Sequence, residues 1–250
     1  MQIQDLLFSQ GFGTRRVCAG LVQQGLVQVN GQVLSEPAQP VQPQGLRYSV
    51  QGVQWLYQER AYLMLHKPAG YECSRKPGAW PSIYTLLPSP LRQRGGGAAA
   101  GVQAVGRLDQ DTTGLLLLSD DGKFIHRMTS PRHHVPKVYE IVARHPVDAR
   151  QLDRLLAGVV LEDHDQPVRA ADCMLTGSHT LRLTLTEGKY HQVKRMVAAV
   201  GNRVEQLHRS RMGDLSLPAD LAVGQWRWLE PGDLRALDGL KDPTEDPTGQ

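Results

Sequence analysis

The sequence has few of the features that mark secreted, membrane-embedded or metal-binding proteins. Its 250 residues include only three cysteines, and these lie far apart: Cys18, Cys73 and Cys173. An odd number of distant cysteines, none with a Cys or His neighbour at ligand spacing, argues against a disulfide framework and a zinc site, so we assign no metal. No apolar stretch is long enough to span a bilayer, and the N-terminus lacks a signal-peptide pattern. We therefore expect a cytoplasmic protein without membrane contact.

The total charge is small, and its distribution is more informative. The formal net charge of +3 at pH 7 does not by itself mark a nucleic-acid-binding protein. Basic residues outnumber acidic ones between Arg182 and Arg211, and acidic residues outnumber basic ones from Glu230 to the C-terminus. This distribution indicates a polyanion site in the body of the protein and a solvated acidic end. A charged surface without a partner fits the same pattern.

The most informative segment runs from Val105 to Leu118. It places Arg107 and Asp109 shortly before the apolar run Gly114–Leu118. A short apolar run bounded by turn signals predicts a strand buried on both faces, which is a rigid support for a catalytic group. Spacing alone also fits an ordinary strand-turn-strand with a solvated aspartate.

This segment resembles the central motif of the pseudouridine synthases, with the residue pattern Gly-Arg-Leu-Asp-x-x-Thr-x-Gly-Leu-Leu-Leu-Leu. The resemblance implies that Asp109 is the catalytic residue. Converting uridine to pseudouridine needs no redox step and no group donor, so no cofactor is implied. A carboxylate suits the reaction because it can add reversibly to an electrophilic carbon and then depart. The sequence leaves open whether Asp109 attacks the ribose or the uracil, but the group must be ionised and should have a basic partner.

A candidate partner lies in the segment Glu187–Met196. A helix over Tyr190–Val200 would bury an apolar stripe and place three basic residues on its other side: His191, Lys194 and Arg195. This segment resembles the third motif of the family, which implies that Lys194 pairs with Asp109. Many relatives have arginine there, so Arg195 remains an alternative partner. Without Asp109, an ordinary solvated helix face would explain these residues.

Further segments resemble other elements of the same family. The run Pro136–Tyr139 implies that Tyr139 stacks on the target uracil, with Lys137 beside it as an RNA contact. Stacking suits this chemistry because a base inside folded RNA must be extruded before it can react. The resemblance also places Arg107 in the space left by the flipped nucleotide, and gives His66–Gly70 a structural role. Taken alone, a tyrosine in a strand is more often part of a core.

The first fifth of the chain carries a separate signal. Two short helices are predicted over Ile3–Gly11 and Thr14–Gly25, followed by an Asn-Gly hairpin over Leu26–Val33. This order resembles the αL RNA-binding module of ribosomal proteins. Arg15 and Arg16 at the start of the second helix would favour a phosphate at its N-terminus. A generic helical cap on the larger domain is the alternative.

Strands outnumber helices in the rest of the chain, and most links are short, which predicts a mixed, largely antiparallel α+β sheet. Strands are expected near Leu46–Val53, Tyr62–Pro68, Gly114–Leu118, Lys137–Ala143, Val159–Glu162, Thr180–Thr186, Val204–Arg209 and Gln225–Leu229, and helices at Lys123–Thr129, Asp148–Leu156 and Tyr190–Val200. Pro88–Gly101 is expected to be a flexible insertion. These expectations divide the chain into an αL-type domain with linker (1–58), a catalytic domain (59–236) and a disordered acidic tail (237–250).

Three segments resemble the branch of the family that acts on small-subunit ribosomal RNA: Thr129–His134, which contains the RNA-contact candidate Arg132, Glu187–Met196 and Leu207–Gly213. The resemblance implies a monomer that modifies uridine 516 of 16S ribosomal RNA, either naked or in a pre-30S particle. Alternatives are a large-subunit synthase of the same family and a non-catalytic ribosome-assembly protein. A glycosidase-like hydrolase that uses Asp109 with Asp111 or Asp120 ranks last.

Overall fold

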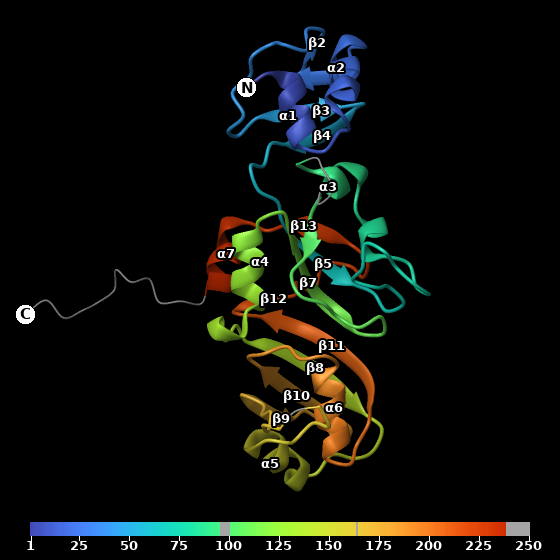
Figure 1. Cartoon of the computed structure of the whole chain (residues 1–250), viewed down its shortest axis with the longest axis vertical. Coiled ribbons are helices and arrows are strands. Elements are labelled where there is room, and N and C mark those ends of the chain that lie inside the picture. The colour runs from blue at the N-terminus through green and yellow to red at the C-terminus, as the bar shows by residue number, and fades with distance from the viewer. Residues whose placement is uncertain (96–100, 164, 239–250) are drawn as a thin grey trace, which may run out of the picture.

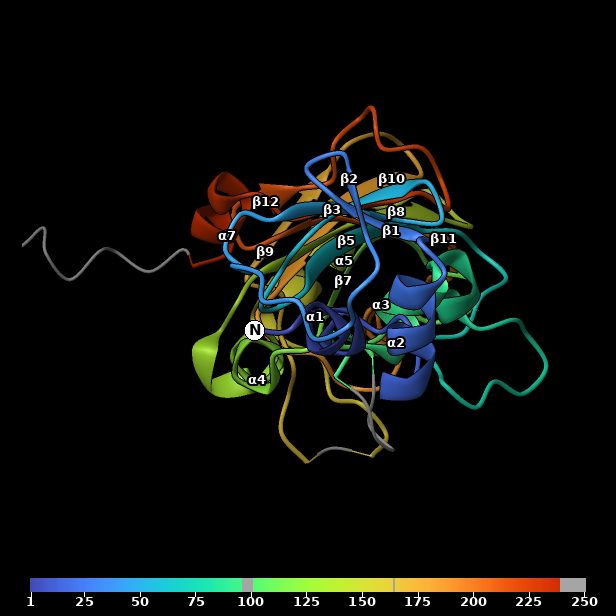
Figure 2. The same ribbon diagram turned by 90° about the horizontal axis from the view of Figure 1, so that it is seen from above.

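The computed structural model describes residues 1–95, 101–163 and 165–238 and shows two sheets, each with its own helices. Figure 1 shows the smaller, N-terminal sheet at one end of the elongated molecule, and Figure 2 looks along the long axis with α1 and α2 in front of the larger sheet. This arrangement confirms the predicted α+β class. No helix of the described part is long and apolar enough to cross a membrane.

The N-terminal domain packs two helices on a four-stranded antiparallel sheet of order β2-β1-β3-β4. Its elements are α1 (Ile3–Ser9), α2 (Arg15–Gln23), β1 (Val27–Val29), β2 (Gln32–Leu34), β3 (Arg47–Val50) and β4 (Val53–Leu56). Thr14, where the second helix was predicted to begin, caps α2 by accepting a hydrogen bond from the Val17 backbone. Asn30 and Gly31 both adopt positive φ, which makes the tight turn that the Asn-Gly pair predicts between β1 and β2.

The larger domain is built on a nine-stranded sheet, in which the path β13-β5-β7-β11-β8-β10-β9 is extended by β12 on β11 and β6 on β7. Its strands are β5 (Tyr62–Lys67), β6 (Gln103–Ala104), β7 (Thr113–Ser119), β8 (Lys137–Ala143), β9 (Asp172–Leu175), β10 (Thr180–Leu185), β11 (Val204–Met212), β12 (Leu215–Ser216) and β13 (Trp226–Trp228). Its helices are α3 (Ser89–Gln93), α4 (Gly122–Thr129), α5 (Ala149–Ala157), α6 (Gln192–Ala199) and α7 (Pro231–Asp238), with 3-10 turns at Ile83–Leu86 and Pro131–His133. Among the strand pairings of this sheet within the described residues, only that of β7 with β11 is parallel.

Strand β7 lies at the centre of the domain and is buried on both faces, as its apolar run predicts. Leu116 and Leu118 belong to a core under α3, α5 and α6. Leu115 and Leu117 belong to a second core, which α4 and α7 cover. All four leucines have 0% exposure, so the strand provides a fixed base for the loop that precedes it.

The two domains are joined by a buried arginine. Arg94 is 3% exposed and donates hydrogen bonds to Asp120 Oδ2 at 2.9 Å, to Gln10 Oε1 at 2.8 Å and to the Gln58 carbonyl at 2.7 Å. Its partners come from the end of α1, from the linker and from the loop after β7. The guanidinium therefore ties three parts of the chain together across the joint.

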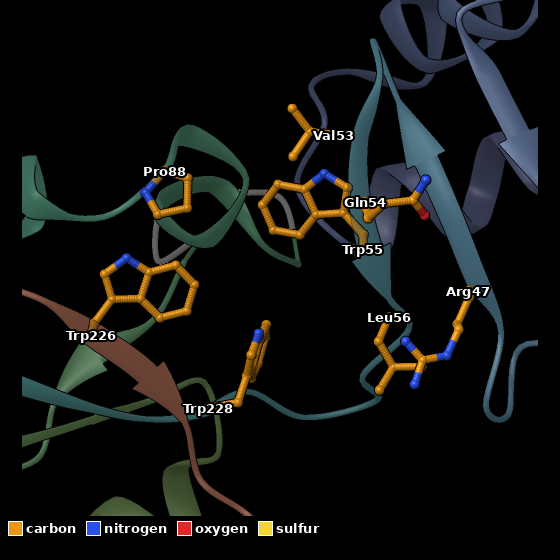
Figure 3. Close-up of a pocket in the computed structure, with 8 residues that line it drawn as sticks. All are labelled: Arg47, Val53, Gln54, Trp55, Leu56, Pro88, Trp226 and Trp228. Carbon is orange, nitrogen blue, oxygen red and sulfur yellow. The ribbon is translucent and has the colours of Figure 1, made fainter. Parts of the chain in front are cut away.

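Beside this joint, an apolar recess of about 420 Å³ lies between the two domains. Figure 3 shows Trp55 of β4 on one side of the recess and Trp226 and Trp228 of β13 with Pro88 on the other. Trp226 and Trp228 meet edge to face, with ring centroids 6.1 Å apart.

Several expectations about the elements are wrong. The expected flexible insertion Pro88–Gly101 instead contains α3 and Arg94, although 96–100 lie outside the described residues. The expected strand Val159–Glu162 is only an isolated bridge from Val159 to Val168. Helix α7 continues to Asp238, so the expected disordered tail cannot begin at 237, and its remainder from 239 lies outside the described residues.

Candidate active site

Asp109 lies in the loop between β6 and β7, four residues before β7 begins, so the buried strand supports the carboxylate from its end and does not carry it. The loop is held by Lys67, which has 0% exposure. The Lys67 ammonium donates hydrogen bonds to the carbonyls of Pro68, Gln110 and Thr112 at 3.0, 3.2 and 2.9 Å. Burial lowers the pKa of Lys67 below its ordinary value. One buried cation thus ties the carbonyls of Gln110 and Thr112, just after Asp109, to that of Pro68, which gives a physical reason for the structural role of His66–Gly70.

Gly114 brings this loop close to β11. It has φ of +109°, and a Cβ added there would lie 2.3 Å from the Arg209 carbonyl oxygen. Only glycine both accepts that backbone angle and leaves room for the neighbouring strand. Gly114 and Arg209 are partners in the parallel pairing of β7 with β11. The glycine therefore sets the position of the Asp109 loop relative to β11.

The basic partner of Asp109 is Lys194. The Lys194 ammonium lies 2.9 Å from Asp109 Oδ2 and 2.6 Å from Asp111 Oδ1, and His191 Nε2 lies 3.3 Å from Asp109 Oδ1. Arg195, the alternative partner, forms an ion pair with Asp163 instead. Burial lowers the pKa of Lys194, but its hydrogen bonds to the two carboxylates outweigh burial and raise it overall. Lys194 therefore stays charged in the cleft.

His191 reaches Asp109 because the helix begins later than its apolar periodicity predicts. α6 starts at Gln192, and His191 precedes it in the left-handed conformation, with φ of +48°. The Gln192 side chain donates to Glu187 Oε1 at 2.7 Å and accepts from the Lys189 backbone at 2.8 Å, which fixes the approach to the helix. Tyr190 stacks on the His191 ring at 3.8 Å between centroids.

These residues border a cleft of about 790 Å³. Among the residues that line it are Glu72, Arg107, Asp109, Asp111, Lys137, Tyr139, Glu187, His191, Lys194 and Arg209. Arg107 is exposed at the rim, whereas Tyr139 and Lys137 are buried, at 9% and 6% exposure. The cleft therefore brings together most of the candidate residues from separate parts of the sequence.

Other candidates lie elsewhere. Arg132 is exposed in the turn after α4 and does not line the cleft. Arg15 and Arg16 are exposed on α2 of the N-terminal domain, where Arg15 lies 3.5 Å from Asp5 and over the Phe8 ring. Arg195 points toward Asp163 and does not contact Asp109. These side chains are not part of the Asp109 cluster.

The sequence did not identify Asp111 as a second partner of Lys194, nor Arg209 as a cleft residue. Arg209 is 3% exposed and lies opposite Tyr139 in the pairing of β11 with β8. Arg209 could have been recognised as a basic residue that lies opposite the candidate Tyr139 on a neighbouring strand. That recognition requires the strand register, which the sequence does not reveal.

Neither Asp111 nor Asp120, the two carboxyl groups considered for glycoside hydrolysis, is suited to act as its acid. Burial raises the pKa of Asp111, but the hydrogen bond and charge of Lys194 outweigh burial and lower it overall, so Asp111 does not hold a proton for a leaving group. Asp120 accepts hydrogen bonds from Arg94 and from the Ala61 backbone at the domain joint and does not line the cleft. Within the described residues, no group of three or more acidic, His or Cys side chains could hold a metal ion. The arrangement instead presents the Asp109 carboxylate beside a charged lysine in a half-open cleft.

A comparison with protein families matches residues 61–199 to the RNA pseudouridylate synthase model, a range that includes Asp109, Tyr139 and Lys194. The chain belongs to the RNA pseudouridylate synthase family. Residues 1–45 match the S4 domain, which covers α1, α2 and the β1–β2 hairpin. The protein is therefore an isomerase, and the expected family and class of enzyme are confirmed.

Individual relatives of this synthase match along almost its whole length. The ribosomal small subunit pseudouridine synthase A of Pasteurella multocida is 39% identical over 235 residues, which are 94% of this chain and 98% of that protein. The protein of the same name from Escherichia coli K12 is 37% identical over 93% of this chain and 98% of that one. A crystal structure of a pseudouridylate synthase, 32% identical, superposes with a TM-score of 0.66 and covers 95% of this chain and 99% of the other.

Proposed function

We propose that this synthase converts one uridine of 16S ribosomal RNA to pseudouridine, with uridine 516 as its target. The observation that carries the proposal is the Asp109–Lys194 ion pair in a cleft large enough for an extruded nucleotide. Relatives named for the small ribosomal subunit, similar over nearly the whole chain, support the choice of RNA. No competing large-subunit or assembly function has a specific observation in its favour.

In this proposal Asp109 is the nucleophile, and Lys194 and His191 hold its carboxylate in place. A carboxylate held by two basic groups is ready to add to an electrophilic carbon of the bound uridine. Tyr139, on β8, offers a ring on which the extruded uracil stacks. Arg107, exposed at the rim, is placed to occupy the position that the flipped nucleotide vacates.

RNA contacts outside the reacting site complete the proposal. Arg15 and Arg16 would bind phosphates at the N-terminus of α2, and Arg132 and Arg195 would hold the RNA nearer the cleft. Inside the cleft, Lys137 and His191 would contact the extruded nucleotide. We assign RNA binding to residues 1–58 and catalysis to residues 59–238, because α7 of the larger domain ends at Asp238. The synthase would act in the cytoplasm as a monomer, on naked RNA or on a pre-30S particle.

The decisive experiment is the substitution Asp109→Asn. Because carbon C5 loses its hydrogen when the new bond forms, release of tritium from RNA labelled at uracil C5 measures turnover. We expect Asp109→Asn to abolish this release and leave RNA affinity largely intact, with Asp153→Asn, an exposed change on α5, as the matched control. Turnover by Asp109→Asn at the wild-type rate would remove Asp109 from the mechanism.

The target and the N-terminal domain need separate tests. Pseudouridine mapping of ribosomal RNA from cells with and without the gene should show one missing site in 16S RNA, and a loss confined to large-subunit RNA would refute the target. Deleting the N-terminal domain would strip Gln10 and Gln58 from the buried Arg94, so it would confound binding with folding. The double substitution Arg15→Gln, Arg16→Gln avoids this problem. We expect it to weaken RNA binding and its salt dependence, and unchanged binding would refute the phosphate contact.

A further inference from the structure

Two buried cations in the cleft have no role in the Asp109 ion pair. Arg209 of β11 is 3% exposed and Lys137 of β8 is 6% exposed. Arg209 pairs directly with Tyr139 across the two strands, and Lys137 lies two residues from Tyr139, so all three side chains project from one face of the sheet. All three line the same cleft as Asp109.

Neither cation has a counter-ion in the described part of the chain. Arg209 Nε donates to the Leu115 carbonyl at 2.8 Å, but Arg209 Nη2 is buried without a hydrogen-bond partner. The Lys137 ammonium makes no hydrogen bond or ion pair with any described residue. Burial, and then the charge of Arg209, lowers the pKa of Lys137 to about 8.

Two neighbouring positive charges without a partner are unfavourable for folding. A purely structural role, in which Arg209 binds the Leu115 carbonyl, explains one hydrogen bond of Arg209. It explains neither the unpaired Arg209 Nη2 nor the presence of Lys137 beside it. Groups arranged in this way fit a ligand that brings negative charge into the cleft.

If the proposed function holds, the reaction itself produces a negative charge in the cleft. When the bond from ribose C1′ to uracil N1 breaks, its electron pair leaves with the uracil, and the resulting negative charge spreads over N1, O2 and O4. After the ring turns, C5 bonds to C1′ and gives up its proton, N1 takes one up, and the Asp109 carboxylate is released from the carbon to which it had added. The product is an isomer of the substrate, so no co-reactant is needed.

We propose that Arg209 and Lys137 form a subsite for the uracil anion, in which they contact its carbonyl oxygens and stabilise it after the glycosidic bond breaks. Donors that are fixed by the fold and are themselves buried favour a charge that develops only during the reaction. Tyr139, between the two cations on the sheet face, holds the ring by stacking while their positive charges act on its edge. Lys194, engaged with both carboxylates, is not free for this task.

Binding of free bases tests the subsite without turnover or RNA. 5-Nitrouracil is far more acidic than uracil and ionises near neutral pH, whereas thymine, of similar shape, stays neutral. By calorimetry we expect the wild-type synthase to bind 5-nitrouracil at least about tenfold more tightly than thymine. This preference should be lost in Arg209→Met and in Lys137→Met. It should persist in Arg211→Met, which changes an exposed arginine on the same strand.

Equal binding of the two bases by the wild type, or a preference that survives in both variants, would overturn the proposal. Lys137→Met breaks no hydrogen bond within the described structure, so it decides the matter if Arg209→Met does not fold. With saturating RNA, Arg209→Met should reduce kcat by about 100- to 1000-fold. An unchanged kcat with weaker, less salt-dependent RNA binding would instead assign the pair to RNA phosphates and overturn the proposal. Failure of the proposed function would appear differently, as a wild-type protein that makes no pseudouridine.

Discussion

Replacing Lys67 by methionine should separate the positioning of Asp109 from its chemistry. The Lys67 ammonium donates to three backbone carbonyls around the Asp109 loop. Each orphaned buried carbonyl costs about 1–3 kcal/mol. Methionine fills similar space and relieves the burial of a charge, which offsets part of this loss. We therefore expect Lys67→Met to lower the free energy of unfolding by about 2–4 kcal/mol.

The effect on turnover should exceed the effect on RNA binding. A reacting group displaced by about 1 Å can lose about 100-fold in rate. Tritium release at saturating RNA should therefore show kcat reduced by about that factor with KM little changed, and urea unfolding should report the loss of stability. Lys123→Met, at an exposed position of α4, is the matched control. A folded Lys67→Met protein with wild-type kcat would refute the idea that this cation positions the loop.

Three further predictions follow from the same geometry. Gly114→Ala should lower the free energy of unfolding by at least about 2 kcal/mol and reduce kcat, because the new Cβ would collide with the Arg209 carbonyl at a positive φ. Urea unfolding and tritium release measure the two effects, and a variant as stable as the wild type would refute the predicted clash. Lys194→Met should reduce kcat more than RNA affinity, and a change confined to salt-sensitive affinity would make Lys194 a phosphate contact. The pKa of Lys137 is 10.5 in the unfolded chain and about 8 in the folded protein, so the unfolded state binds more protons between these pH values. The free energy of unfolding should therefore rise by about 3 kcal/mol as the pH increases from 8 toward 10.5. Urea unfolding should show this rise in the wild type and not in Lys137→Met, and parallel pH curves for the two proteins would refute it.

The parts of the fold that the sequence predicts well are those with local causes. The Thr14 cap, the Asn-Gly turn and the apolar run of β7 each depend on neighbouring residues, and each lies where it was expected. The start of α6 was predicted two residues too early, since apolar periodicity cannot show that His191 adopts a left-handed conformation.

The parts that could not be predicted depend on contacts between distant segments. Arg94 follows a proline-containing segment and precedes a run of glycines and alanines, a composition typical of flexible chain, yet its partners lie 26 to 84 residues away and make it a buried joint. The choice of Lys194 over Arg195 depended on where Asp163 lies, which no motif specifies. Arg209 became a candidate only through its register opposite Tyr139.

The engagement of Arg94 by both halves of the molecule also determines how the protein melts. Separating the S4 domain would break the hydrogen bond of Arg94 to Gln10 and both hydrogen bonds between Gln10 and Gln58, a state less favourable than the intact joint. Separating the two domains would therefore gain little conformational entropy and would break a large share of the hydrogen bonds at the joint. The two domains should therefore unfold in a single calorimetric transition, with no populated intermediate in which one domain is folded and the other is unfolded.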